Sequence, residues 1–386
     1  MHKIKKETWQ TIGLLVAIAV VVVGVLIWNG QNPIDYTMYS ASGIRYESGT
    51  VIEVQSESTE PMDGDSDRLL GEQILTVRMD EGELKGQEIT VVNNLSTTHN
   101  IYTLPGDKVI VKVDAPEGVE PFYSIYNYDR NTGLIVIVLI FIALIAVVGR
   151  KKGIKSIVGL LFTMFLILCF LLPMIYQGYS PVWVSVITIL VSVVVSMLLL
   201  NGFSKKTAVA ITATIIGVLL AALVFSIFSS ILNLSGYNLE EAEELILISQ
   251  HTGLQISQVL FAGILIASLG AVMDITMSVA AALHELHLQK PDMNAKHLFR
   301  SGMSIGHDMI GTMCETLVLA FTGTAITTLL VLISYGVQFQ QLISSDYIAI
   351  EIVHAITGSI AVILAVPLTS FLYAAFAAKS EVRHKR

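Results

Sequence analysis

Ionisable side chains interrupt three long apolar stretches in the C-terminal half of the chain. Asp274 lies within "GAVMDITMSVAAALHEL", and Asp308 and Glu315 lie within "GMSIGHDMIGTMCETLVLAF". Glu351 and His354 stand near the start of a third stretch. Carboxylate and hydroxyl oxygens bind hard cations, imidazole suits divalent transition metals, and a carboxyl group in a low dielectric keeps its proton. These residue types predict cation binding or proton transfer, and they leave the identity of any metal open.

Helical spacing groups these side chains with hydroxyls. Residues three, four or seven apart share one face of an α-helix, so Ser278 lies beside Asp274, and Thr312 lies beside Asp308. The candidate binding residues are Asp274, Ser278, Asp308, Thr312, Glu315, Glu351 and His354.

The hydrophobic setting of these groups limits where they point. An ionised carboxylate at the bilayer centre costs about 2.5–3.5 kcal/mol on insertion scales. We therefore expect Asp274 and Asp308 to face the interior of a helix bundle, opposite one another, with Glu315 as a third member. The alternative is that these carboxyl groups are uncharged or paired and only fix helix packing through hydrogen bonds. For Glu351 and His354, which lie near the predicted outer surface, the two alternatives have equal weight.

Small residues at helical spacing predict where helices approach closely. Glycine and alanine allow two helix backbones to pack closely inside a membrane. The predicted helix-packing positions are Gly263, Ala267, Gly270, Ala271, Gly302, Gly306 and Gly311.

The composition is that of a membrane protein. Hydrophobic residues make up 53% of the 386 residues and charged residues only 14%, against roughly 25% charged in soluble proteins. About 20 apolar residues cross the hydrocarbon as a helix. Eight such stretches lie near Thr11–Trp28, Gly133–Gly149, Ser156–Ile175, Val182–Leu200, Thr207–Leu232, Leu254–Leu283, Met309–Tyr335 and Tyr347–Ala375. We therefore predict an α-helical polytopic membrane protein with about eight transmembrane helices, the first a retained anchor without a small-residue cleavage site.

Basic residues predict the orientation of these helices. If residues 1–30 begin in the cytoplasm, Lys and Arg gather in the cytoplasmic segments, whereas the short outer loops contain neither residue. This bias places both termini in the cytoplasm. The predicted domains are an N-terminal tail and anchor (1–30), an extracytoplasmic domain (31–130), a seven-helix membrane domain (131–378) and a basic cytoplasmic tail (379–386).

The segment 31–130 is acidic and is predicted to be all-β. It holds 18 Asp and Glu against 7 Lys and Arg. Its alternating runs of Val, Ile and Thr are separated by Gly, Asp and Pro-Gly turns, which indicate short strands. Five or so strands predict a small barrel or sandwich, OB-like or SH3-like. Cys169 and Cys314 both fall in apolar runs, so disulfides do not hold this segment together.

Several activities are not expected. The chain contains neither a Walker A nor an HExxH pattern, and we expect no nucleophile elbow, so neither an ATP-driven pump nor a known hydrolase is predicted. No basic patch indicates nucleic-acid binding. We therefore expect no enzymatic activity, no cofactor and no nucleic-acid partner. The lipid bilayer is the expected partner.

The two stretches that hold Asp274 and Asp308 resemble the paired signature of the YibE/F-like family of bacterial multi-pass membrane proteins. The resemblance extends from about Ile135 to the C-terminus and implies the bacterial cytoplasmic membrane, but no settled biochemical activity. The matching positions are Gly270, Met273, Asp274, Met277, Ser278, Gly306, Asp308, Gly311, Thr312 and Met313. His307 and Glu315 stand where the family pattern has Arg and Asn, so the resemblance supports no common role for Glu315.

The anchor and the β segment resemble the longer, YibE-type members, which often accompany a shorter relative. The resemblance therefore implies a second YibE/F-type membrane subunit as a partner. Together these features predict a permease for an ion or small solute, with Asp274 and Asp308 as its intramembrane carboxylate pair. The alternative is a non-transporting assembly or signalling subunit whose outer domain binds a partner and whose aspartates serve packing.

Overall fold

The structure is a computed structural model that describes residues 2–34, 43–116, 118–237 and 242–384. The chain forms two compact units, one made of Met1–Ile34 and Ala146–Arg386 and the other of Asp35–Ile145. The boundary between the units thus falls inside a helix, some fifteen residues after the predicted domain boundary at residue 130. Of the predicted cytoplasmic tail, residues 385–386 lie outside the described residues.

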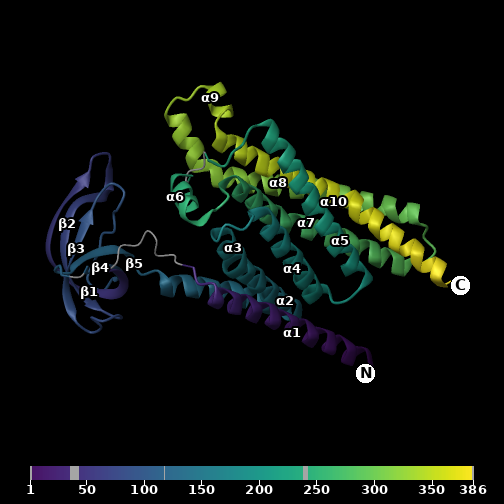
Figure 1. The fold of residues 1–386 in the computed structure, drawn as a ribbon, viewed down its shortest axis with the longest axis horizontal. Helices are drawn as coiled ribbons and strands as arrows, with labels where there is room; N and C mark the ends of the chain where they lie inside the picture. The colour runs from purple at the N-terminus through teal and green to yellow at the C-terminus, as the bar shows by residue number, and fades with distance from the viewer. Residues whose placement is uncertain (1, 35–42, 117, 238–241, 385–386) are drawn as a thin grey trace. The chain divides into compact units, whose positions relative to one another are not determined.

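Helices make up most of the chain (Figure 1). They are α1 (His2–Gln31), α2 (Asn131–Leu166), the π-helix η1 (Ile167–Leu171), α3 (Leu172–Tyr176), α4 (Pro181–Asn201), α5 (Lys205–Ile231), α6 (Ala242–Thr252), α7 (Ile256–Gln289), α8 (Ala295–Ser334), α9 (Phe339–Ile343) and α10 (Asp346–His384). Within the described residues, seven helical stretches are long and apolar enough to cross a membrane. The chain is a polytopic membrane protein.

One of these stretches is long enough to cross twice. Asn131–Tyr176 comprises 46 residues, which is about 69 Å at 1.5 Å per residue and roughly twice the hydrocarbon thickness. Its helical geometry is broken at Arg150, where φ is 49° and ψ is −133°. The break separates the predicted spans Gly133–Gly149 and Ser156–Ile175. All eight predicted spans therefore fall on helices, to within two residues at their ends, and two of them share this stretch.

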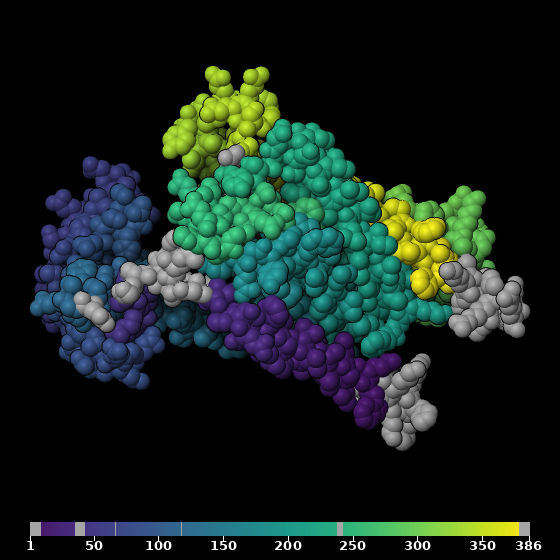
Figure 2. Space-filling view, viewed as in Figure 1, coloured from purple at the N-terminus to yellow at the C-terminus, as the bar shows by residue number. Residues whose placement is uncertain are grey.

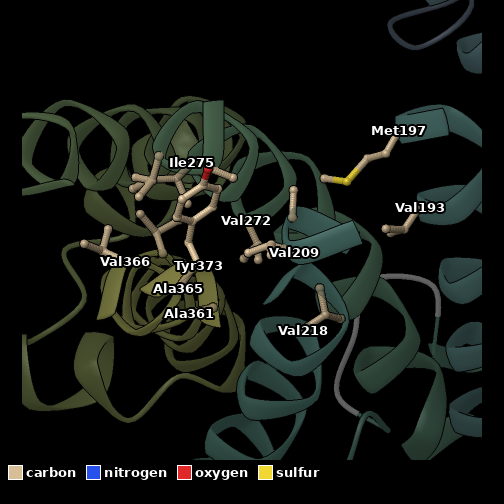
Figure 3. Packing of buried hydrophobic residues seen from close by; sticks show 14 of the residues in the cluster. Val193, Met197, Val209, Val218, Val272, Ile275, Ala361, Ala365, Val366 and Tyr373 are labelled. Atoms are coloured by element: carbon tan, nitrogen blue, oxygen red, sulfur yellow. The ribbon is translucent and has the colours of Figure 1, made fainter. Parts of the chain in front are cut away.

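The core of the helical unit lies where α4, α5, α7 and α10 meet. Val272 and Ile275 of α7 belong to the same buried cluster as Ala361 and Ala365 of α10 (Figure 3). All four side chains are fully buried. A Cβ on Gly217 of α5 would lie 2.9 Å from Val272, so the absence of a side chain there lets the two backbones approach closely.

α1 lies along the edge of the helical unit, beside α4 (Figures 1 and 2). Leu14 packs against Phe162 and Leu166 of α2 and against Val195 and Leu199 of α4. Many of the other α1 side chains are exposed apolar residues. An apolar surface of this kind suits contact with lipid.

Helix ends predicted to be cytoplasmic lie together in the helical unit. A cavity of about 420 Å³ is lined by Gln10 and Thr11 of α1, by Lys155 of α2 and by residues 198–204 between α4 and α5. The positive-inside bias assigns these three regions to one side of the membrane. The fold therefore places these three regions at one end of the helical unit.

Five strands of the second unit form a closed barrel. They are β1 (Ile44–Met62), β2 (Asp65–Met79), β3 (Glu88–Leu95), β4 (Lys108–Asp114) and β5 (Phe122–Tyr128). Their order is β1-β2-β3-β5-β4, and β4 closes the barrel on β1. The pair β3–β5 is parallel and the other pairs are antiparallel. This is the order of a five-stranded Greek-key OB-type barrel, which confirms the predicted small barrel.

A buried polar network crosses the wall of the barrel. Asn93 Nδ2 donates to Gln73 Oε1 over 2.9 Å, and both side chains are fully buried. Gln73 Oε1 also accepts from the backbone N–H of Thr103, while Gln73 Nε2 donates to Glu57 Oε2, each over 3.2 Å. Hydrogen bonds of this kind offset the cost of burying amide groups. They attach the loop between β3 and β4 to β1 and β2.

The barrel is predicted to lose stability in acid through Glu57. The hydrogen bond from Thr59 lowers the pKa of this carboxyl most; burial opposes it, and hydrogen bonds from Gln73 and Tyr102 lower the pKa further. A pKa that is depressed in the folded state stabilises the fold above the unfolded value, and this contribution disappears as the pH falls. Hydrogen exchange of β1–β3, corrected for intrinsic rates, should therefore accelerate as the pH falls below 4.5, the ordinary value of this carboxyl.

The Glu57→Gln variant should lack this acid-dependent part, because glutamine does not titrate. Glu60→Gln, a substitution on the same strand, is the matched control and should keep it. Equal acid dependence in wild type and Glu57→Gln would contradict the prediction.

Candidate intramembrane site

Two glycines determine how α8 packs on α10. A Cβ on Gly302 would overlap Ser370 Oγ, and a Cβ on Gly306 would overlap the side chain of Val366. Both glycines therefore occupy helix-packing positions, as predicted. Ser304 lies between them in a G-x-S-x-G spacing, but within a continuous helix. A nucleophile elbow needs a strand-to-helix turn, so this spacing serves packing.

The same contact continues toward the far end of α10. A Cβ on Gly358 would lie 3.4 Å from Leu317 of α8 and 3.6 Å from Ser268 Oγ of α7, so three helices meet at this glycine. Pro367 lies inside α10, directly after the residue that packs on Gly306. Proline has no N–H, so the carbonyl of Ile363 lacks its usual helical donor.

Asp274 is exposed on the face of α7 that turns away from α8. A methyl of Leu283 would lie 2.9 Å from a Cβ on Gly302 of α8, so this part of α7 contacts α8. Nine residues separate Leu283 from Asp274, which is half a turn around the helix at 100° per residue. Ser278, one turn from Asp274, is half-buried.

The small residues beside Asp274 do not pack within the chain. Gly263, Ala267 and Gly270 are exposed, and an added Cβ at either glycine would meet nothing within 4 Å. Gly311 of α8 is exposed and open in the same way. Within this chain these positions meet no other helix, so their packing role stays a prediction, whereas the half-buried Ala271 packs against the core.

The polar residues of α8 are exposed as well. Asp308, Thr312 and Glu315 all lie on its uncovered surface. Asp308 follows Gly306 by two residues, about 200° around the helix, and therefore points away from α10. Only 6% of the most apolar window of α8 is buried, against 50% for α7. The expectation that these carboxylates face the bundle interior is wrong for the chain taken alone.

Asp274 and Asp308 do not form the predicted pair. In the part of the chain that the structure describes, neither makes a hydrogen bond or an ion pair. At 1.5 Å per residue from the contact of Leu283 with Gly302, Asp308, Asp274 and Glu315 lie about 9, 14 and 20 Å along the helices. Asp308 and Glu315, seven residues apart, share one exposed face of α8, whereas Asp274 lies on the exposed face of α7.

Two half-buried candidate residues with solvent-shielded polar atoms belong to α10. Glu351 Oε2 and His354 Nε2 are shielded from solvent and have no hydrogen-bond partner among the described residues, and the same holds for Thr357 Oγ1. The imidazole of His354 lies between Phe321 of α8 and Phe225 of α5, with ring centroids 5.6 and 6.3 Å away. A buried polar group without a partner costs about 1–3 kcal/mol. Three such groups within two turns of α10 indicate that this part of the helix binds something that supplies the hydrogen bonds.

Glu351 also lines a groove between α8 and α10. The groove has a volume of about 400 Å³, and its lining is otherwise apolar apart from Thr322. Phe321, which contacts the ring of His354, forms part of the same wall. The carboxyl group of Glu351 is thus reached from this groove.

Three buried hydroxyl residues on α5 and α7 were not among the site residues predicted from the sequence. Ser268 lies near Gly358, and Thr214 and Thr276 share a hydrogen bond of 2.6 Å between α5 and α7. All three hydroxyl residues are at most 2% exposed. Hydroxyls in helices often bond only to their own backbone, so the sequence carried a weak signal: the eight-residue spacing of Ser268 and Thr276.

The described residues contain no group of three His, Cys, Asp or Glu side chains placed to hold a metal ion. Glu351 and His354 are a carboxyl and an imidazole only, in an apolar setting. Such a pair can exchange a proton or bind a small polar species; it does not complete a metal site, which needs more protein ligands.

Comparison with known proteins decides the family. The profile of the YibE/F-like protein family matches residues 137–379, which is well over half of the chain. The chain belongs to the YibE/F-like family. The matched region of this family member contains α7, α8 and α10, and with them every candidate residue named above. No curated protein and no solved structure matches the chain.

The contact of α8 with α10 predicts opposite outcomes for two neighbouring glycines. Gly306→Ala places a methyl group into Val366, and overpacking of this kind costs about 1–3 kcal/mol. Gly311→Ala adds the same methyl group to open space and removes a poor helix former. Thermal unfolding in detergent should show a lower Tm for Gly306→Ala and an unchanged or higher Tm for Gly311→Ala. Equal midpoints would contradict the observed packing.

The hydroxyl pair of α5 and α7 should show energetic coupling. A double-mutant cycle of Thr214→Val and Thr276→Val in lipid bicelles should give a coupling free energy of unfolding of about 0.6–1.7 kcal/mol, the range measured for hydrogen bonds between membrane helices. Thr312 and Thr316 bond to backbone carbonyls of their own helix. A cycle on that pair is the control and should give a value close to zero.

Proposed function

We propose that this chain is a permease for an ion or small solute, and that the carboxylates exposed on α7 and α8 line its pathway. The observation that carries the proposal is the exposure of Asp274, Asp308 and Glu315 on helices long and apolar enough to cross the membrane. Carboxylates facing hydrocarbon are costly. Water or another protein must therefore cover these faces in the bilayer.

We propose that a second membrane subunit of the same family packs over these exposed faces of α7 and α8. Gly263, Ala267 and Gly270 continue the face of Asp274 along α7, and small residues let a neighbouring helix approach closely. In this arrangement the pathway runs between two subunits, with Asp274 at the contact. Carboxylate and hydroxyl oxygens favour a hard cation or a proton-coupled solute as the substrate.

The proposed location is the bacterial cytoplasmic membrane, with both termini in the cytoplasm and residues 31–130 outside. The support is the bias of Lys and Arg toward alternate segments, together with the shared cavity that joins three of these segments. The acidic OB-type barrel then stands on the outer side, where it collects the substrate or holds a partner.

The second candidate function is a non-transporting assembly or signalling subunit. The stripe of Gly263, Ala267 and Gly270 favours it, because an exposed small-residue face suits a helix–helix contact whether or not anything is transported. In that role Asp274 and Asp308 would fix the contact through hydrogen bonds.

Replacing the two aspartates separates these functions. In proteoliposomes screened with divalent cations and small organic anions, the wild type should give a flux that depends on the pH, because a proton-coupled solute is one of the two proposed kinds of substrate. The Asp274→Asn, Asp308→Asn double variant should lose the flux and keep its protein level and subunit assembly. Asp292→Asn, in the exposed loop between α7 and α8, is the matched control and should retain the flux.

A flux that ignores both the pH and the removal of the two aspartates would contradict the permease function. Loss of folding or assembly in the double variant, with no flux in the wild type, would favour the assembly subunit.

A further inference from the structure

We propose that Glu351 and His354 form a proton-binding site inside the helical unit, and that the bound proton is the coupling ion of the permease. The coupling role rests on the proposed function. Proton binding is a property of the site itself and can be measured without any transport.

The geometry of α10 brings a carboxyl group and an imidazole together. Glu351 and His354 are three residues apart and so lie on the same side of the helix, one turn from each other. Glu351 Oε2 and His354 Nε2 are both shielded from solvent without a partner among the described residues. Both groups are titratable, and a protonated carboxyl group beside a neutral imidazole is the uncharged state that such a setting favours.

The side chains that pack around Glu351 and His354 are apolar. Phe225 of α5, Leu260 of α7 and Phe321 of α8 belong to the apolar surface packed around this turn of α10. In the described part of the chain, the side chains that contact this turn from α5, α7 and α8 in the ring pairs, the buried cluster and the groove are all non-titratable. Among these contacts of the described residues no cation balances a carboxylate, so protonation neutralises it at the least cost.

Other acidic groups of α8 and α10 lie apart from the pair. Asp346, at the start of α10, precedes Glu351 by five residues, about 7.5 Å along the axis. Glu315 of α8 is on the exposed surface of its helix, whereas Phe321 of the same helix faces His354.

A groove leads to the site from one side, and buried hydroxyl groups follow it on the other. The groove between α8 and α10 reaches Glu351. On the other side, Thr357 Oγ1 is buried without a partner one turn beyond His354, and Ser268 of α7 follows beside Gly358. A proton on the pair therefore has a route from the groove and hydroxyls ahead of it.

Infrared difference spectroscopy of the full-length protein in liposomes tests the proposal, with the proton itself as the probe. Between about pH 9 and about pH 5, the wild type should gain the band of a protonated carboxyl group in an apolar environment. Glu351→Gln should lose one such band. Glu243→Gln, on the exposed surface of α6, should retain it. His354→Gln should keep the band and shift its midpoint by about one pH unit or more, since the two groups titrate together.

Identical spectra for the wild type and Glu351→Gln would overturn the proposal. So would a carboxyl band that responds at fixed pH to Na⁺ or Mn²⁺ and not to the pH, since this identifies a cation site. If Glu351→Gln does not fold, Glu351→Asp retains a carboxyl group and should move the band, and an unmoved band would likewise overturn the proposal.

Flux measurements keep this proposal separate from the permease function. Proton binding in a protein that moves no solute would support the site and contradict the permease function. Solute flux that persists unchanged in Glu351→Gln, after proton binding is lost, would overturn the coupling role alone.

Discussion

Hydrocarbon offers no hydrogen-bond partner and screens no charge, and this constraint accounts for most of the helical unit. Helices satisfy their own backbone, and hydroxyls such as those of Thr369 and Ser370 bond to a carbonyl one turn back on the same helix. Against this background the groups left without a partner stand out. Two sets concern the candidate site: carboxylates exposed on α7 and α8, and the buried polar atoms of Glu351, His354 and Thr357; Ser185 Oγ and His287 Nδ1 are also buried without a partner among the described residues.

α10 connects the two sets. It packs against α5, α7 and α8 through small residues, including Ala361, Ala365 and Gly358. Its N-terminal part carries Glu351 and His354, and its C-terminal part receives Gly302 and Gly306 of α8. α8 has little other cover, so the position of its exposed carboxylates depends on how it lies on α10.

Much of this fold could be predicted from the sequence, for identifiable reasons. Apolar length alone located every membrane-crossing stretch, and alternating β-branched residues located the barrel. The spacing of Gly302 and Gly306 correctly marked a close helix contact. The surroundings of Asp274 could not be predicted, because periodicity assigns a residue to a helix face without saying which helix, if any, that face meets. The pairing of Thr214 with Thr276 joins residues far apart in the chain, so no local pattern could reveal it.

The buried site shows a different limit. Glu351 and His354 were singled out by type and spacing, but a binding role and a purely structural role had equal weight for them. Their burial comes from rings on α5 and α8, helices that precede them by many residues. Only the tertiary fold could show that the polar atoms of this turn are enclosed.

Pro367 has a mechanical consequence. The carbonyl left without a donor at Ile363 makes this point the easiest place for α10 to bend. Val366, the residue just before it, is seated in the notch of α8 left by Gly306. If α10 bends at Pro367, the bend therefore lies at its contact with α8. The part of α10 that holds Glu351 and the part that holds Tyr373 then change their angle to each other.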